Sequence, residues 1–335
     1  MKAKWLGKTG LKVQPLGFGG IPIQRINEEE AVTLIQEAID RGINFIDTAR
    51  GYTDSEKKIG LAIQGLREKI ILASKSPALT YRDMKRDIEI SLEQLGVETI
   101  ELYQVHNLRS EDDFHALMAS EGGYKALQEA REAGIIKHIG ITGHDVDLLV
   151  ETLKTGRFET VQAPFNAIED QAKSELFSIA RDREVGIIVM KPLAGGAIKS
   201  AGPALRYILE HDISVVIPGM ENIQQLAENL QAAAAPPLQD NERKALLAEA
   251  DELGRTFCRR CGYCLPCPEG IDIPTIFILE GYHDRYQMAD WARERYSNLA
   301  IQADRCEECG ICEEKCPYQL PIREMLQTAH SKLGS

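Results

Sequence analysis

The stretch NEEEAVTLIQEAIDRGINFID, residues 27–47, contains the pattern that decides the fold. Its first part repeats apolar residues at helical spacing and stops at Gly42, a residue that commonly ends helices. Asn27 can cap this helix, and the glutamates that follow suit the positive end of the helix dipole. The last five residues, INFID, are mainly apolar, as in a buried strand. The stretch therefore predicts a helix followed directly by a strand.

The same alternation of strand and helix recurs from about residue 13 to residue 230. Eight strands, each followed by a helix, match the length and order of a (β/α)8 TIM barrel, an α/β fold. A doubly wound sheet is the alternative, but no G-x-G-x-x-G follows the first strand. The barrel is favoured. Its predicted strands are residues 15–20, 43–47, 69–74, 100–106, 135–142, 160–164, 186–191 and 213–218.

Composition limits the functions that the chain can have. Hydrophobic residues make up 44% of the 335 residues and charged residues 27%, which is ordinary for a folded, soluble protein. The formal charge of -12 has the wrong sign for binding nucleic acid phosphates. No apolar run is long enough to span a membrane, and the first residues lack the apolar segment of a signal peptide. We expect a cytoplasmic protein without nucleic acid or membrane partners.

Four polar residues lie at or just after the ends of successive predicted strands. They are Asp47, Tyr52, Lys75 and His106. Barrel active sites form at the carboxyl ends of the strands, so neighbouring strands would bring these side chains together. A tyrosine beside an ammonium group has a lowered pKa and can give a proton to a developing alkoxide. The pattern predicts one shared site in which Tyr52 can donate a proton.

The motifs FIDTARGY, ILASKS and LYQVHN, which carry these four residues, resemble the aldo-keto reductase superfamily. The likeness runs through roughly residues 3–235 and includes GITGH (140–144), VQAPFN (161–166) and MKPLAGG (190–196) in order. It implies NAD(P)H-dependent interconversion of aldehydes or ketones and alcohols. It also implies that Tyr52 is the general acid and base, assisted by Lys75, Asp47 and His106.

The resemblance further implies a coenzyme site. Gln162 matches the residue that holds the nicotinamide carboxamide, while Thr142 and Gly143 replace the Ser-Asn pair of the family. The positions that commonly carry basic residues for a 2'-phosphate hold Gly219 and Gln225, so NADPH and NADH both stay open. The implied coenzyme residues are Thr142, Gln162, Pro192, Leu193, Gly195, Gly219, Gln225, Glu228 and Asn229.

All eight cysteines follow residue 257, in the two motifs CRRCGYCLPCP (258–268) and CEECGICEEKCP (306–317). The second has the C-x2-C-x2-C-x3-C-P spacing of bacterial ferredoxins, in which the fourth cysteine binds the other of two [4Fe-4S] clusters. The first motif is one residue shorter before its last cysteine. Two four-thiolate zinc sites are the alternative, and a secreted disulfide framework fits a chain of this size poorly.

The spacing predicts how the cysteines divide between the two clusters. One cluster is predicted to use Cys258, Cys261, Cys264 and Cys316, and the other Cys267, Cys306, Cys309 and Cys312. The 38 residues between Cys267 and Cys306 read as helix, which indicates a mainly α-helical ferredoxin-like domain. We therefore expect a barrel at 1–235, a linker and connecting helix at 236–256, and this domain at 257–335. The whole chain resembles a subgroup of aldo-keto reductases with such a dicluster module.

Two functional hypotheses follow. In the first, the protein is an enzyme acting on a small carbonyl or alcohol substrate, and its clusters are structural or exchange electrons with a partner protein. In the second, it is an electron-transfer or redox-sensing protein whose barrel binds nucleotide as a regulator. Nicotinamide moves two electrons as hydride whereas each cluster moves one, and a flavin normally joins the two. The intact set of four reacting residues favours the enzyme.

Overall fold

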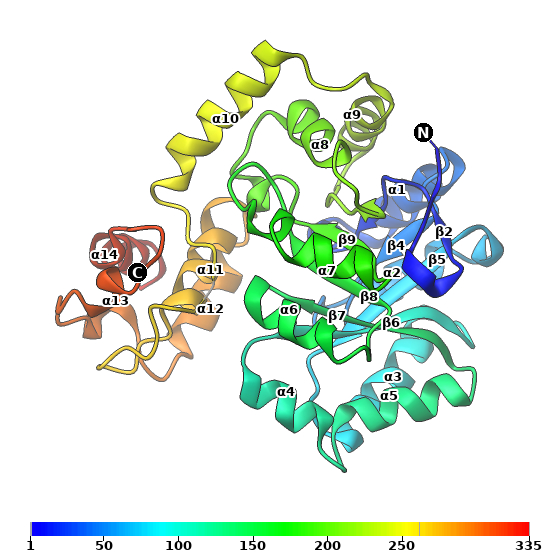
Figure 1. Ribbon diagram of the computed structural model, residues 1–335, viewed down its shortest axis with the longest axis horizontal. Coiled ribbons are helices and arrows are strands. Elements are labelled where there is room, and N and C mark those ends of the chain that lie inside the picture. The colour runs from blue at the N-terminus through cyan, green and yellow to red at the C-terminus, as the bar shows by residue number, and fades with distance from the viewer. Residues whose placement is uncertain (1, 261, 335) are drawn as a thin grey trace. The chain divides into compact units, whose positions relative to one another are not determined.

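The computed structural model describes residues 2–260 and 262–334. The chain divides into two compact units (Figure 1). The first comprises Met1–Pro192 and Ser200–Arg243, and the second comprises Leu193–Lys199 and Lys244–Ser335. The short segment Leu193–Lys199, although it follows a strand of the first unit, groups with the second.

The first unit is built on eight parallel strands that neighbour one another in chain order. Bridges Leu16–Val216 and Gly19–Gly219 join the last strand to the first, and the Gly17 N–H donates to the Val216 carbonyl at 2.8 Å. This closure confirms the predicted barrel and excludes the open, doubly wound sheet. The strands are β3 (Phe18–Gly19), β4 (Phe45–Asp47), β5 (Ile71–Ser76), β6 (Ile100–Leu108), β7 (Ile136–Gly143), β8 (Thr160–Pro164), β9 (Gly186–Met190) and β10 (Val215–Val216).

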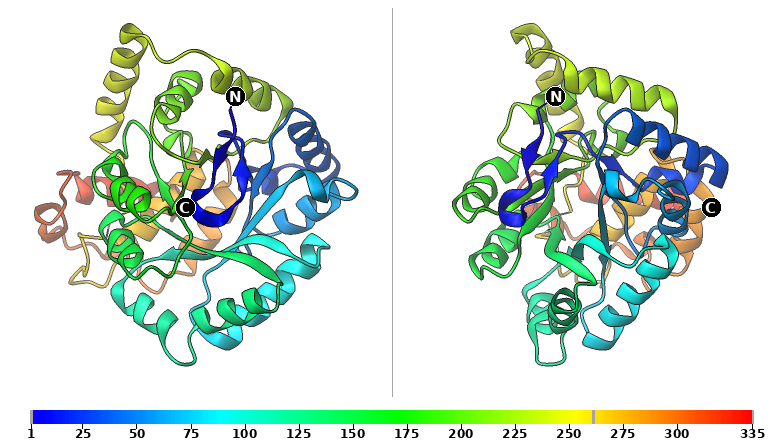
Figure 2. Two further views of the ribbon diagram at one scale, coloured as in Figure 1. Left: turned by 45° about the vertical axis from the view of Figure 1, so that its right-hand side comes forward. Right: turned by 90° about the vertical axis from the view of Figure 1, so that its right-hand side faces the viewer.

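Helices surround these strands (Figure 2). In the first of them, the Asn27 side chain accepts from the Glu30 N–H and the Glu30 carboxylate accepts from the Asn27 N–H, a complete capping box. Gly42 follows the helix at φ 95°, a conformation that favours glycine. The helices are α1 (Glu28–Asp40), α2 (Ser55–Ala62), α3 (Tyr81–Leu95), α4 (Glu111–Met118), α5 (Gly123–Glu132), α6 (Val146–Lys154), α7 (Leu176–Asp182), α8 (Ala201–Leu209) and α9 (Ile223–Ala234). The division between the two units falls within the next helix, α10 (Asp240–Gly254).

A short hairpin that the sequence did not reveal seals the amino-terminal end of the barrel. Strands β1 (Lys4–Trp5) and β2 (Lys12–Val13) pair antiparallel, and Leu6 between them is fully buried. Leu6 belongs to the interior core with Phe45, Leu102 and other strand residues. The N–H of Lys8 donates to the Glu184 carbonyl at 2.7 Å, just before β9 begins. The barrel is therefore closed at the end opposite the predicted active site.

The second unit is mainly helical, as predicted. Its core packs Ile276, Phe277, Tyr296 and Leu326 together, and Tyr296 is fully buried. Its remaining helices are α11 (Ile273–Asp284), α12 (Ala289–Ser297), α13 (Ile311–Glu314) and α14 (Ile322–Leu333).

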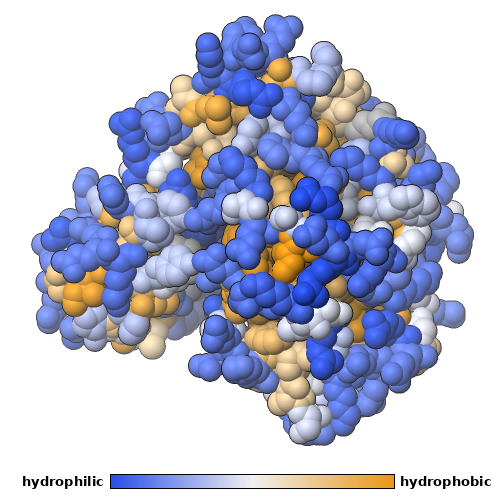
Figure 3. Space-filling view, in the orientation of Figure 1, coloured by the Kyte–Doolittle hydropathy of each residue, from blue (hydrophilic) through white to orange (hydrophobic). Residues whose placement is uncertain are grey.

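The visible surface is mostly hydrophilic, with scattered hydrophobic patches (Figure 3). This agrees with a chain in which 90 residues, 39 basic and 51 acidic, carry charge. Among the helices described, none has the length and hydrophobicity needed to cross a membrane.

Leu6→Ala should destabilise the barrel by about 3 kcal/mol, because the substitution leaves a cavity where the hairpin of β1 and β2 seals the barrel. The free energy of unfolding, from a urea titration followed by circular dichroism, measures this effect. The matched control is Trp5→Ala, since Trp5 is 61% exposed and its loss should cost less than about 1 kcal/mol. Equal losses in the two variants would contradict the sealing role of Leu6.

Candidate active site and cysteine pocket

A buried ion pair lies at the centre of the candidate active site. Asp47 is the last residue of β4, and Lys75 lies near the end of the neighbouring strand β5. The Lys75 Nζ donates to Asp47 Oδ2 at 2.6 Å and to the Thr48 carbonyl at 2.8 Å. Both side chains are at most 3% exposed. Burial lowers the pKa of Lys75, and the Asp47 carboxylate opposes that shift.

Tyr52 and His106 meet beside this pair. The Lys75 Nζ lies 4.8 Å from the centroid of the Tyr52 ring. The Tyr52 and His106 rings are 5.7 Å apart between centroids and nearly perpendicular, at 87°. Tyr52 is held in the loop after β4, where its N–H donates to the Ala49 carbonyl and its own carbonyl accepts from the Ser55 N–H. The structure thus brings all four predicted catalytic side chains together.

A bulge in β6 sets the position of His106. The pairing of β6 with β7 shifts register between Val105 and Leu108, and Asn107 has a φ of 61°. The Asn107 N–H donates to Thr142 Oγ1 on β7 at 2.7 Å. Bulges of this kind redirect a side chain near an active site. Here the bulge carries His106, and the Thr142 hydroxyl fixes the residue that follows it.

The surroundings of His106 disfavour its charged form. Burial lowers the pKa of His106 well below its ordinary value, and the nearby cation of Lys75 pushes in the same direction. The imidazole is therefore neutral near pH 7 and keeps one N–H to donate.

Gln162 and Thr142, two predicted coenzyme residues, are paired on the neighbouring strands β8 and β7. Both are 1% exposed. The Gln162 Nε2 faces the Met190 Sδ at 3.8 Å, and its Oε1 accepts from Gln104 Nε2 at 3.1 Å. A thioether is a weak acceptor, so this amide nitrogen is suited to a stronger partner such as the carboxamide oxygen of nicotinamide.

Gln104 is a site residue that the sequence reasoning missed. It is fully buried in β6 and also donates to Asp47 Oδ1 at 3.2 Å. Because strand side chains alternate between faces, Gln104 lies on the face of β6 that Lys75 occupies on β5, with which it pairs. A polar residue two positions before His106 on a buried strand was the signal that could have identified it.

The predicted adenosine-side residues lie on and before α9. Gly219 follows β10, where an added Cβ would meet Pro22 Cγ at 2.5 Å. The Gln225 N–H donates to the capping Asn222. Glu228 is exposed and accepts from Gln224, whereas Asn229 is 5% exposed.

The predicted pyrophosphate loop divides between the two units. Pro192 ends the first unit, while Leu193 and Gly195 belong to the second. Gly195 has a φ of 68°, and a Cβ there would lie 2.8 Å from the Tyr286 hydroxyl. The left-handed backbone at residue 195 therefore favours glycine.

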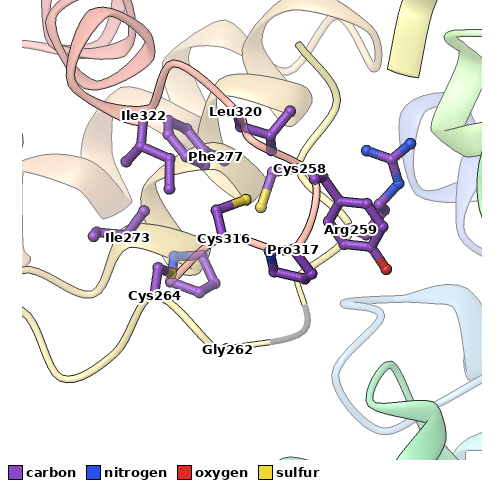
Figure 4. Close-up of a pocket in the computed structure, with 12 residues that line it drawn as sticks. Cys258, Arg259, Gly262, Cys264, Ile273, Phe277, Cys316, Pro317, Leu320 and Ile322 are labelled. Carbon is purple, nitrogen blue, oxygen red and sulfur yellow. The ribbon is translucent and has the colours of Figure 1, made fainter. Parts of the chain in front are cut away.

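In the second unit, Cys258, Cys264 and Cys316 line one pocket of about 330 Å³, part of which opens to solvent. The sulfur atoms of Cys258 and Cys316 point into the same space (Figure 4). Apolar walls surround it, formed by Ile273, Phe277, Leu320 and Ile322 among others. Cys261, the fourth predicted ligand, lies outside the described residues. The cysteine sulfur atoms and the apolar walls fit an iron–sulfur cluster.

The other predicted ligand set lies in the same unit. Cys312 belongs to its core, Cys267 and Cys306 pack against that core, and Cys309 is exposed. No disulfide joins any of the seven cysteines that the structure describes.

Zinc and iron–sulfur clusters place different demands on the cysteines. A single zinc ion needs every thiolate about 2.3 Å from one point. The thiolates of a cuboidal cluster bind different iron atoms, so they need not converge in this way.

Comparisons with known proteins identify both units. The profile of the aldo/keto reductase family matches residues 15–203, more than half of the chain, and that of the 4Fe-4S dicluster domain matches residues 257–321. L-galactose dehydrogenase of Arabidopsis thaliana is 29% identical over 280 residues, which cover 68% of this chain and 86% of that protein. NADH-specific methylglyoxal reductase of Escherichia coli is 26% identical over 216 residues, or 58% of this chain and 65% of that one.

Among solved structures, the aldo-keto reductase AKR11C1 of Bacillus halodurans in its holo form superposes with a TM-score of 0.65 at 25% identity. The match covers 76% of this chain and 96% of that one. The family profile spans the strands that carry Asp47, Lys75 and His106, and the dicluster profile spans the cysteine pocket. The chain therefore belongs to the aldo/keto reductase family of oxidoreductases and carries a 4Fe-4S dicluster domain after the barrel.

Proposed function

We propose that the protein interconverts aldehydes or ketones and alcohols, using NAD(P)H as the hydride donor. The observation that carries this proposal is the meeting of Tyr52, Lys75 and His106 at the carboxyl ends of adjacent strands. The names of two relatives, a methylglyoxal reductase and an L-galactose dehydrogenase, support a reaction that runs in either direction.

Tyr52 gives the proton in this proposal. Hydride addition to a carbonyl leaves negative charge on its oxygen, which needs an acid close by. Once its proton has left, the Tyr52 phenolate is stabilised by the Lys75 ammonium 4.8 Å from the ring centroid. Asp47 keeps that ammonium oriented through the 2.6 Å hydrogen bond.

His106 has a different task. Because its imidazole is neutral near pH 7, it donates a hydrogen bond to the carbonyl oxygen and positions it for protonation. When bound, NAD(P)H supplies the hydride. Gln162 would hold its carboxamide, and the residues from Gly219 to Asn229 would hold the adenosine end. One relative is named as NADH-specific, so the proposal includes NADH as well as NADPH.

The second unit would bind two [4Fe-4S] clusters. Three thiols around one apolar pocket support the ligand set Cys258, Cys261, Cys264 and Cys316 for the first cluster. Cys267, Cys306, Cys309 and Cys312 would hold the second. The clusters would stabilise this unit or pass single electrons to a partner protein, since hydride chemistry in the barrel needs none of its cysteines.

The variant Tyr52→Phe should lower kcat about 1000-fold, because the general acid is lost. Coenzyme affinity should stay within about twofold, since the ring remains in place. Carbonyl-dependent oxidation of NADPH and of NADH, followed by absorbance over a panel of aldehydes and ketones, measures the rate. The control is Tyr81→Phe, whose hydroxyl only bonds Glu129 on the surface. More than a tenth of the wild-type rate in Tyr52→Phe would contradict the proposal.

Thr142→Val should lower kcat about tenfold, because the partly buried Asn107 N–H loses its acceptor and the bulge that carries His106 relaxes. Thr142→Ser keeps the hydroxyl and should restore most of the rate. Steady-state kinetics separate this role from a coenzyme contact. If Thr142 mainly contacted the coenzyme, the Kd of the coenzyme would rise in Thr142→Val while kcat stayed near the wild-type value.

Paired cysteine variants test how the ligands divide. Wild type purified without oxygen should hold about eight iron ions and eight sulfides per chain. Cys258→Ser combined with Cys316→Ser should remove a single cluster and leave about four iron ions, because both residues serve the same cluster. Cys258→Ser combined with Cys267→Ser should remove both clusters.

Iron and sulfide assays with EPR spectra read these outcomes. Equal iron in the two double variants would contradict the division of ligands. About two zinc ions per chain without sulfide would contradict the clusters themselves.

A further inference from the structure

Gln104 occupies a place between the reacting residues and the coenzyme site. It lies in β6, paired with Lys75 of β5 on one side and with Gly140 of β7 on the other. Gly140 pairs in turn with Thr160 of β8, two residues before Gln162. A Cβ on Gly140 would lie 2.9 Å from Gln104 Cγ, so the glycine leaves room for the long side chain to reach across.

One amide group of Gln104 serves two acceptors. Its Nε2 donates to Asp47 Oδ1 at 3.2 Å and to Gln162 Oε1 at 3.1 Å. An amide nitrogen carries two hydrogens, so both bonds form at once. Gln104 is 0% exposed, and its Oε1 has no partner among the described residues. The side chain thus spends its whole donor capacity on linking Asp47 to Gln162.

The charge on Asp47 determines which way each amide faces. A carboxylate can only accept hydrogen bonds, so Gln104 must turn its nitrogen toward Asp47. The opposite orientation would place two oxygens, Asp47 Oδ1 and Gln104 Oε1, about 3.2 Å apart. With its nitrogen fixed, Gln104 also donates to Gln162, so Gln162 must accept this hydrogen bond with its Oε1. The Gln162 nitrogen then faces the Met190 thioether and also bonds the Asp47 carboxylate, which helps to hold it in this orientation.

We propose that Gln104 is a positioning residue that fixes the amide of Gln162, so that Gln162 donates a hydrogen bond to the carboxamide oxygen of the nicotinamide ring. This inference rests on the proposed function, because it takes Gln162 as the carboxamide contact. It adds that the ion pair used in proton transfer also sets the polarity of the coenzyme contact. Gln162 then forms its hydrogen bond with the oxygen of the carboxamide and not with the N–H groups of the carboxamide.

Coenzyme analogues test this polarity in the wild-type chain. The 3-acetylpyridine analogues of NAD+ and NADP+ keep the carbonyl oxygen and lack the amide N–H groups. Their Kd values, from quenching of protein fluorescence, should lie within about threefold of those of the parent coenzymes. Binding weakened tenfold or more would overturn the proposal, because it would show that Gln162 accepts from the carboxamide.

Two substitutions test the role of Gln104 itself. Gln104→Met keeps the length of the side chain and removes both donors, so the Kd of NAD+ or NADP+ should rise about tenfold at every pH. Gln104→Glu keeps the shape and places a carboxyl group beside Asp47. Burial and the neighbouring charge raise the pKa of such a carboxyl, which donates only while protonated. Affinity in Q104E should therefore recover as the pH falls from 8 to about 6.

A coenzyme Kd in Q104M within twofold of wild type would overturn the positioning role. Equal pH dependence in Q104E and Q104M would do the same, because a residue that only fills space has no donor to regain. These titrations need no carbonyl substrate. A wild-type chain that binds coenzyme but reduces nothing would contradict the proposed reaction and would still decide the role of Gln104.

Discussion

The buried pair of Lys75 and Asp47 is the interaction on which the rest of the site depends. Two charges removed from water are tolerated only because each meets the other and further hydrogen bonds satisfy their remaining atoms. Lys75 uses a backbone carbonyl for this purpose, and Asp47 uses Gln104. Removing one partner of such a pair typically costs about 3–5 kcal/mol. The charges that we propose prepare Tyr52 for proton transfer are thus also part of the core.

This arrangement also weighs between the two functional hypotheses. A protein that bound nucleotide only as a regulator would gain nothing from burying a lysine and an aspartate beneath a tyrosine. In the proposed reaction, by contrast, the buried Lys75 ammonium stabilises the Tyr52 phenolate that forms beside it. The thiol-rich second unit stands apart in its chemistry, since none of the eight cysteines lies in the barrel sequence. In the proposed function, the barrel carries out the two-electron chemistry and the cysteines of the second unit take no part in it.

Much of the fold was predictable because long periodic segments leave a clear pattern. All eight barrel strands were expected close to where they lie, and Asn27 caps α1 as its sequence indicates. The hairpin of β1 and β2 escaped notice, since each strand has only two residues and shows no alternation.

The four reacting residues could be predicted because each marks the end of a strand or the loop after it. The contacts around them could not. The bulge that turns His106 depends on a hydroxyl from another strand, and the role of Gln104 depends on three strands at once. Such relations between strands leave no local pattern in the chain. They become visible only when the barrel closes.

The hairpin plug makes the barrel a cup with a single rim. Leu6 fills its floor and Lys8 ties that floor to the segment before β9, so nothing passes through the amino-terminal end. A coenzyme that binds at Gln162 and a substrate that binds at Tyr52 must therefore both enter and leave at the carboxyl end of the barrel. The closed floor thus leaves one rim in common to both reactants of the proposed reaction.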